Sequence, residues 1–214
     1  MPTVPPVDYG WQSEKSILEC HQHMLEEEVA ADVTFIVGKK KQEVRAHKYM
    51  LICRSPVFHA MFCGPLAEDN NINIPDIEPD VFLVFLSCEN TPGNIMPTVP
   101  PVDYGWQSKK TITECHQHML EEGIATDVTF LVGKEKQIVR AHKYMLICRS
   151  PVFQAMFCGP QLLLSDDNKI VIPDIEPDVF LVLLRFIYYY KPSLSDSTVL
   201  SVLYAAKKYL VSSW

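Results

Sequence analysis

The sequence lacks the features that mark several large classes of protein. It has no basic surplus, since 19 Lys and Arg stand against 26 Asp and Glu and the formal net charge is -7 at pH 7. This balance argues against a nucleic-acid-binding protein. No apolar run approaches the ~18 residues of a membrane span, and the longest, residues 179–190, is interrupted by Arg185. We therefore predict a protein that binds neither nucleic acid nor membrane.

Enzyme signatures are also missing. The chain has no phosphate-binding glycine loop, no Gly-x-Ser-x-Gly and no zinc-protease motif. The proline-rich, uncharged residues 1–6 do not resemble a secretory signal. The chain has 7 cysteines, an odd number, six of which occupy three repeated positions. We read them as reduced thiols in the cytoplasm or the nucleus. These observations predict a protein with no enzymatic activity and no cofactor.

What the chain does contain is a long internal repeat. Residues 1–65 align on residues 96–160 without a gap, at a constant offset. Ten positions differ: Glu14/Lys109, Ser16/Thr111, Leu18/Thr113, Glu28/Gly123, Val29/Ile124, Ala31/Thr126, Ile36/Leu131, Lys40/Glu135, Glu43/Ile138 and His59/Gln154. A repeat this long indicates a duplicated module rather than a short solenoid unit. We call residues 1–95 copy one and residues 96–214 copy two.

Copy two is the more complete module. Its pattern predicts a helix over 109–122 capped by Ser108, strands over 127–132 and 137–141, a short helix over 142–148, and a helix begun by Ser150-Pro151. A strand over 169–172 and helices over 176–189 and 195–209 follow. This α-β-β-α-α-β-α-α order predicts an α+β fold, a small sheet with clustered helices, in two tandem copies.

Copy one is shorter at its end. Residues 74–83 repeat residues 172–181, but the two sequences diverge after Leu86. Thr91-Pro92-Gly93-Asn94 carries breaker residues, so the last helix and a half are missing. We expect this loss to leave Val81, Phe82, Val84 and Phe85 uncovered, as an aggregation or partner-binding surface. The predicted boundaries are residues 13–86 for the incomplete domain, 87–107 for the linker and 108–210 for the complete domain.

A metal site was weighed at Cys20-His21-Gln22-His23 and at its twin, residues 115–118. Cys20 and His23 share a helix face, but no short-spaced second ligand pair lies within a copy. The preferred interpretation is no metal, with surface histidines and a packed thiol. Three adjacent tyrosines, residues 188–190, could stack on a ligand, and burial against the terminal helices is preferred.

Several segments together resemble a BTB/POZ domain. They are residues 106–107, 127–133, 140–143, 150–153, 155–159, 172–177, 186–188 and 203–209. The Trp-Gln start and the Ala-Ala-Lys-Lys-Tyr end resemble the branch in which BTB is followed by BACK and PHR domains. Asp32 with His47, and Asp127 with His142, resemble the buried polar pair of that family. A catalytic relay from such a pair would need a nucleophile, for which Cys53 or Cys148 could be proposed, and a structural network is preferred.

The resemblance implies a protein-interaction module that pairs through its first helix. In this chain the apolar face of that helix comprises Ile17, Cys20 and Met24 in copy one and Ile112, Cys115 and Met119 in copy two. The resemblance also implies binding to cullin-3 of ubiquitin ligases, through the helix after Ser-Pro and a hydrophobic-x-Glu motif beyond it. The corresponding residues are Met61, Phe62, Leu66 and Glu68, and Met156, Phe157, Leu164 and Asp166.

Two arrangements and two functions stay open at this stage. The copies could pair within one chain, or copy two could pair between chains while copy one stays partly disordered. The leading function is BTB-mediated dimerisation with an adaptor role for a cullin-3 ligase, with partners cullin-3, the protein itself or other BTB proteins. The alternative is a self-association scaffold, or a competing truncated form without a ligase link.

Overall fold

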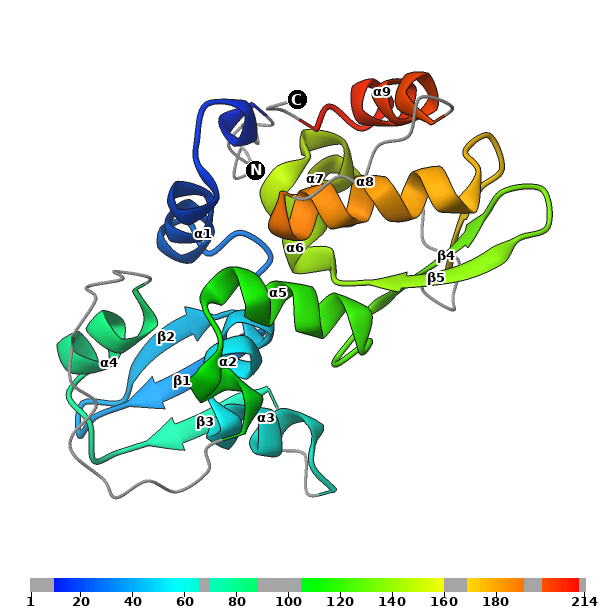
Figure 1. Cartoon of the computed structure of the whole chain (residues 1–214). Coiled ribbons are helices and arrows are strands. Elements are labelled where there is room, and N and C mark those ends of the chain that lie inside the picture. Colours follow the sequence, from blue (N-terminus) through cyan, green and yellow to red (C-terminus); the bar gives the residue numbers. More distant parts are fainter. Residues whose placement is uncertain (1–9, 66–69, 88–104, 160–168, 191–197, 212–214) are drawn as a thin grey trace. The chain divides into compact units, whose positions relative to one another are not determined.

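A computed structural model describes residues 10–65, 70–87, 105–159, 169–190 and 198–211 (Figure 1). Within this part of the chain, the elements follow the predicted order in both copies. Copy one contains η1 (Trp11–Ser13), α1 (Ile17–Glu26), β1 (Val33–Val37), β2 (Gln42–Ala46), α2 (Lys48–Arg54), α3 (Pro56–Cys63), β3 (Asn71–Ile74) and α4 (Pro79–Leu86). Copy two contains η2 (Trp106–Lys109), α5 (Ile112–Glu121), β4 (Val128–Val132), β5 (Gln137–Ala141), α6 (Lys143–Arg149), α7 (Pro151–Cys158), β6 (Lys169–Ile172), α8 (Pro177–Tyr189) and α9 (Val199–Lys208).

The chain folds into two compact units that do not coincide with the two copies. One unit combines Met1–Cys20 with Thr126–Trp214, and we call it the copy-two unit. The other is His21–Ala125, the copy-one unit. Each unit therefore holds the sheet and following helices of one copy together with an opening segment of the other. The sequence alone did not predict this exchange, and the domain boundaries given above stay a prediction.

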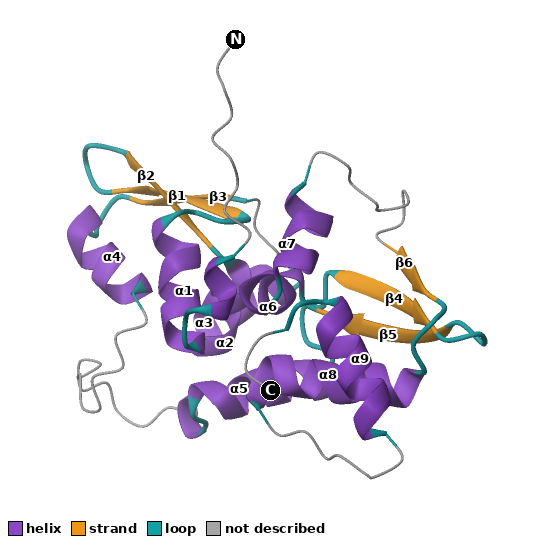
Figure 2. Cartoon of the chain, turned by 90° about the horizontal axis from the view of Figure 1, so that it is seen from above, coloured by secondary structure: helices purple, strands orange, loops and turns teal. Residues whose placement is uncertain are grey.

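Each copy has a three-stranded sheet with a central first strand. In copy one, β1 pairs antiparallel with β2 and parallel with β3, which gives the order β2-β1-β3. The sheet of copy two has the order β5-β4-β6 with the same directions. Alternate residues of the central strand are buried, and Phe35 and Phe130 are fully buried at its middle. In Figure 2, α2 and α3 lie on one side of the β1–β3 sheet. The α+β prediction is confirmed.

Local capping signals explain where several helices begin. Ser55 and Ser150 cap α3 and α7 by accepting a hydrogen bond from the backbone N–H three residues on, with proline at the first helical position, as predicted. The predicted cap at Ser108 is wrong, because α5 begins at Ile112. There Thr111 and Glu114 form a capping box that satisfies two backbone N–H groups at once.

The long α8 and the last helix give copy two its deeper core. Tyr188 and Tyr189 are buried as predicted, whereas Tyr190 ends α8 in a left-handed conformation and is exposed. The backbone N–H of His142 donates to the Tyr188 hydroxyl at 2.8 Å. That hydroxyl is also 2.8 Å from His142 Nδ1, within hydrogen-bonding distance. Burial raises the pKa of Tyr188 well above its usual value, so the phenol stays protonated.

Copy one retains a smaller core around its sheet. The core cluster includes Phe35, Phe58 and Phe82, and the ring centroids of Phe35 and Phe82 lie 4.9 Å apart. The prediction that Phe82 is uncovered is wrong, because this side of α4 faces the sheet. Val81, Val84 and Phe85 lie on the other side and are exposed as predicted. The described residues of copy one thus form an inner core and leave this side of α4 exposed.

Replacing Tyr188 by Phe tests the polar link inside copy two. The substitution leaves the buried backbone N–H of His142 without its acceptor, which costs about 1–3 kcal/mol. We expect the free energy of unfolding, measured by urea denaturation, to fall by that amount. Tyr204→Phe is the control, because this exposed hydroxyl donates to the exposed carboxylate of Asp174, and its loss should cost no more than about 0.5 kcal/mol. Equal losses in both variants would contradict the assignment.

Candidate functional site

The opening segment of each copy is held by a buried glutamine. In the copy-two unit, Gln12 Nε2 donates to the carbonyl of Ile147 at 3.1 Å and to Gln154 Oε1 at 2.6 Å. In the copy-one unit, Gln107 Nε2 donates to the carbonyl of Ile52 at 3.3 Å. Ile147 and Ile52 lie in the last turns of α6 and α2, where helix carbonyls have no partner within the helix. The exchanged glutamines therefore satisfy backbone groups of the other copy.

These glutamines were not singled out as site residues from the sequence. Their signal was the repeated Trp-Gln pair, Trp11-Gln12 and Trp106-Gln107, which was noted only as part of the family resemblance. A second signal was the substitution of His59 by Gln154. Gln154 accepts a hydrogen bond from Gln12, whereas the His59 ring lies 6.3 Å from the Trp106 ring. One of the ten differences between the copies therefore lies at this contact.

A pair of thiols accompanies each exchanged segment. In the copy-two unit, a hydrogen bond with Cys148 lowers the pKa of Cys20, and the nearby Arg149 guanidinium acts in the same direction. In the copy-one unit, a hydrogen bond with Cys53 lowers the pKa of Cys115. All four cysteines are buried and reduced. Each pair joins the first helix of one copy to the helix after the hairpin of the other.

The residues predicted for dimerisation lie on the apolar faces of α1 and α5. Cys20, Met24, Cys115 and Met119 are buried. Ile17 and Ile112, at the first turns of these helices, are half-buried. Burial fits a packing role, and the part these residues play in dimerisation stays a prediction.

The prediction of surface histidines at His21 and His116 is wrong, because both side chains are buried. In the copy-one unit, the Tyr49 hydroxyl and His116 Nδ1 are 2.9 Å apart, and the two rings stack with centroids 5.6 Å apart. The His21 ring lies 5.3 Å from His116. Hence these imidazoles are packed against aromatic neighbours. Among the described residues, no group of three His, Cys, Asp or Glu side chains is placed to hold a metal ion.

The proposed buried polar pair of Asp32 and His47 is wrong for the aspartate. Asp32 is exposed, and its carboxylate accepts a hydrogen bond from the backbone N–H of Lys48 at 2.8 Å. His47 is buried, and its Nε2 donates to the carbonyl of Val29 at 2.8 Å. Asp127 repeats the aspartate contact with the N–H of Lys143. The aspartate therefore fixes the start of the following helix.

The residues predicted for cullin binding are only partly described. Met61 and Phe62 on α3, and Met156 and Phe157 on α7, are half-buried. The Phe62 ring stacks on Phe58 with centroids 6.0 Å apart, and Phe157 stacks on Phe153 in the same way at 6.1 Å. Leu66, Glu68, Leu164 and Asp166 lie outside the described residues. The described half of each predicted site is thus a partly exposed aromatic ridge.

This architecture defines a class: a small α+β domain that is present twice, in which each unit is completed by the opening segment of the other copy. The family model of the BTB/POZ domain matches residues 21–93 and 116–214, and the chain belongs to this family of protein-interaction and self-association domains. The resemblance inferred from the sequence is confirmed.

Similar proteins come from several vertebrates. The chain is 47% identical over 110 residues to BTB/POZ domain-containing protein 6-A of Danio rerio, covering 50% of this chain and 20% of that protein. It is 44% identical over 109 residues to BTB/POZ domain-containing protein 3 of Homo sapiens, with the same coverage. For BTB/POZ domain-containing protein 6 of Mus musculus, the identity is 44% over 114 residues, covering 52% and 21%. The chain thus aligns with about a fifth of each relative. Separately, none of the described helices is long and apolar enough to cross a membrane.

The buried His47 predicts a pH dependence of the copy-one unit. Burial lowers the pKa of His47 below its usual value, so the folded unit favours the neutral ring. The unfolded chain binds a proton below about pH 6.5, and stability is therefore lost as the pH falls from about 6.5 toward the folded pKa. We expect the free energy of unfolding to fall over this window, and NMR titration to show a depressed pKa for His47. A His47 pKa at or above 6.5 would contradict this.

Proposed function

We propose that the chain is a tethered BTB pair, in which each copy occupies the pairing surface of the other within one polypeptide. The supporting observation is the reciprocal placement of Gln12 on Ile147 and Gln107 on Ile52. Both glutamines are buried, and each supplies a hydrogen bond that a helix end of the other copy needs. The pair would act by binding proteins rather than by catalysis.

Tethering favours pairing within the chain over pairing between chains. Two sites on one polypeptide meet at an effective concentration that reaches the millimolar range for short connections. A separate chain at micromolar concentration competes poorly against this. The opposing arrangement, with copy two pairing between chains, would leave Gln107 and Cys115 to another partner. The folded core of copy one supports the tethered form.

The buried thiol pairs provide a direct test of pairing within the chain. Mild oxidation with diamide should form the disulfides Cys20–Cys148 and Cys53–Cys115, detected by peptide mass spectrometry. Cys63 and Cys158 serve as controls. Desolvation by neighbouring groups raises the pKa of both thiols, which disfavours the reactive thiolate even though the two residues are exposed.

Isotope mixing decides whether these disulfides are within or between chains. The experiment refolds equal amounts of unlabelled and 15N-labelled protein together before oxidation. Pairing within the chain gives cross-linked peptides of a single isotope class, and sedimentation shows a compact monomer. Mixed-isotope peptides at both pairs, with a homodimer in sedimentation, would overturn the tethered pair.

The proposed finer role is that of a cullin-3 ligase adaptor, with α7 of copy two as the contact. Met156 and Phe157 form the partly exposed ridge on α7, and the Lys143 ammonium lies 5.8 Å above the Phe157 ring. Copy one offers the matching ridge of Met61 and Phe62 on α3. Copy one carries the closer hydrophobic-x-Glu match, Leu66 with Glu68, whereas copy two has Leu164 and Asp166 at these positions.

A pull-down with the N-terminal region of cullin-3 tests this role. Truncating a central aromatic anchor typically costs about 2 kcal/mol or more, so Phe157→Ala should weaken binding by at least about tenfold. Phe62→Ala is the matched variant in copy one, and the larger of the two losses identifies the copy that binds. The control is Ile138→Ala on β5, an exposed position outside both ridges.

Absence of cullin binding by the unchanged protein would remove the adaptor role. The remaining function would then be the self-association scaffold, or a truncated form that competes with longer relatives for BTB partners. Residence in the cytoplasm or the nucleus is part of the same proposal and rests on the reading of the cysteines as reduced thiols.

A further inference from the structure

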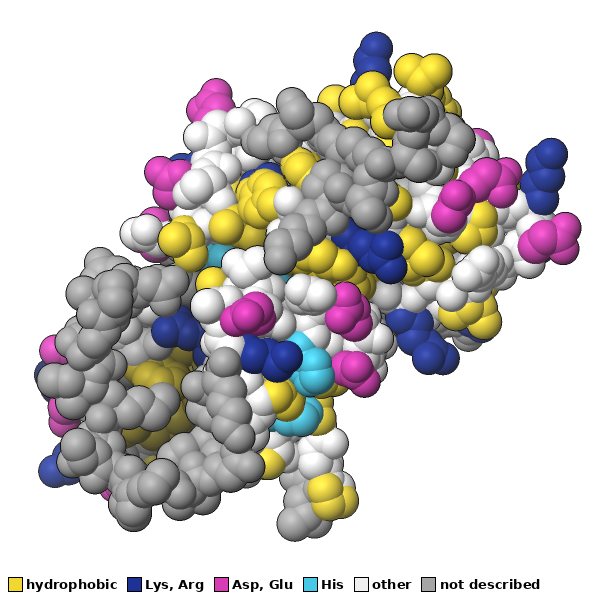
Figure 3. Space-filling model, viewed as in Figure 1, with side chains coloured by type: hydrophobic (Ala, Val, Ile, Leu, Met, Phe, Trp, Pro, Cys, Tyr) yellow, Lys and Arg dark blue, Asp and Glu magenta, His cyan; other side chains and the backbone are white. Residues whose placement is uncertain are grey.

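The same helix face is covered in copy two and open in copy one. In copy two, Ile175, Val179, Val182 and Leu183 expose 3%, 4%, 8% and 0% of their surface. The aligned residues of copy one, Ile77, Val81, Val84 and Phe85, expose 38%, 62%, 74% and 45%. In the view of Figure 3, hydrophobic side chains are visible at the lower left, among the residues of copy one. Since the residue types are nearly the same, the difference reflects what covers them.

Helix α9 is the cover in copy two. It packs on α8 and buries Val202, Ala205 and Ala206, while Tyr209 follows at its end. The Tyr209 ring stacks on Phe153 with centroids 4.5 Å apart and planes 6° apart. The Ser150 hydroxyl, which also caps α7, donates to the carbonyl of Tyr209. The end of α9 is therefore fixed by one stacking contact and one hydrogen bond.

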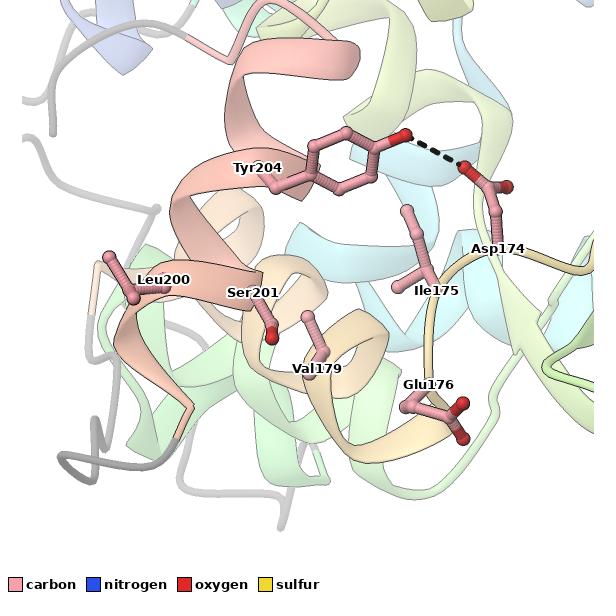
Figure 4. Close-up of a pocket in the computed structure, with 7 residues that line it drawn as sticks. All are labelled: Asp174, Ile175, Glu176, Val179, Leu200, Ser201 and Tyr204. Carbon is pink, nitrogen blue, oxygen red and sulfur yellow. Dashed lines mark hydrogen bonds between the residues drawn. The ribbon is translucent and has the colours of Figure 1, made fainter.

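A charged contact sets the position of α9 along this face. The Lys208 ammonium lies 2.7 Å from both carboxylate oxygens of Asp174, and the Tyr204 hydroxyl donates to the same carboxylate at 3.1 Å. These contacts lower the pKa of Asp174, with Lys208 as the largest cause. Figure 4 shows Tyr204 pointing from α9 to Asp174 across the side chain of Ile175. A hollow of about 260 Å³ is lined by residues 174–176, by Val179 of α8, and by Leu200, Ser201 and Tyr204 of α9.

Copy one keeps the receptor half of this contact. Ser55 and Phe58 correspond to Ser150 and Phe153, and Asp76 and Ile77 correspond to Asp174 and Ile175. Asp76 is exposed. The described residues of copy one contain no counterpart of α9, and its sequence departs from copy two after Leu86. The sequence of residues 88–104 does not repeat that of α9 and contains Pro92, Pro97, Pro100 and Pro101.

We infer that the open face of α4 binds a helix of the α9 type supplied by another polypeptide. The partner presents small and β-branched residues at helical spacing and a lysine opposite Asp76. The α9 of this chain is already seated on copy two. A second copy of the chain likewise has, among its described residues, one such helix for two faces, so we assign the occupant to a different polypeptide.

A peptide of residues 198–211 is the probe, labelled with fluorescein and titrated against the full chain. We expect saturable binding of one peptide per chain by fluorescence anisotropy. Val84→Asp should weaken binding by at least about tenfold, because the carboxylate would be buried against an apolar helix face. Val84 is 74% exposed, so this variant should fold normally. Val57→Asp, at an exposed position on α3, is the matched control and should bind as the unchanged chain does.

A charge exchange fixes the register of binding. Asp76→Lys should weaken binding of the unchanged peptide, and a peptide carrying Lys208→Asp should recover affinity for that variant. If binding ignores the substitutions at Val84 and Asp76, the peptide is displacing α9 from copy two and the inference fails. No saturable binding at 100-fold excess of peptide, or equal loss with Val57→Asp, would overturn it as well.

Discussion

The hydrogen bond from a glutamine of one copy to a helix-end carbonyl of the other is the contact on which the architecture depends. Helices α2 and α6 have seven residues each, so more than half of their carbonyls lie in a last turn that has no partner within the helix. Both helices are largely buried. A buried carbonyl without a partner costs about 1–3 kcal/mol. Gln107 supplies the donor for Ile52 and Gln12 supplies it for Ile147.

The divergence after Leu86 explains the different depth of the two cores. In copy two, α8 continues for another turn and delivers Tyr188 to His142, and α9 delivers Tyr209 to Phe153. In copy one the corresponding aromatic space is partly used by Phe85, whose ring lies 6.1 Å from Phe58 and 6.3 Å from Phe82. This ring remains 45% exposed, so it replaces only part of the missing cover.

Local signals made most of the fold predictable from the sequence. The Ser-Pro starts of α3 and α7, the alternation in β1 and β4, and the long apolar α8 all depend on neighbouring residues. The error at Ser108 arose because two capping candidates stood close together, and the capping box of Thr111 with Glu114 satisfies more backbone groups. Phe82 was misjudged because an eight-residue helix buries one side, and only the sheet contact shows which side that is.

The candidate site was less predictable because it depends on contacts between copies. His21 and His116 read as surface residues when each helix is considered alone, yet ring contacts from distant segments bury them. The role of Gln12 likewise follows from a contact 135 residues away along the chain. Periodicity reports which residues share a face and carries no information on which copy that face meets. A duplicated sequence makes this harder, since either copy offers the same partner residues.

Duplication and truncation together change what such a module can bind. When both pairing surfaces are filled from within the chain, concentration no longer controls pairing, and other BTB chains must compete against a tethered partner. In the part of the chain that the structure describes, the ridges on α3 and α7 and the face of α4 then remain available to outside proteins. The α4 face differs from the ridges because copy two shows which helix covers the equivalent face. There α9 packs on α8, and Lys208 forms a salt bridge with Asp174. The sequence of α9 in copy two therefore indicates which kind of helix from another polypeptide fits the exposed face of α4.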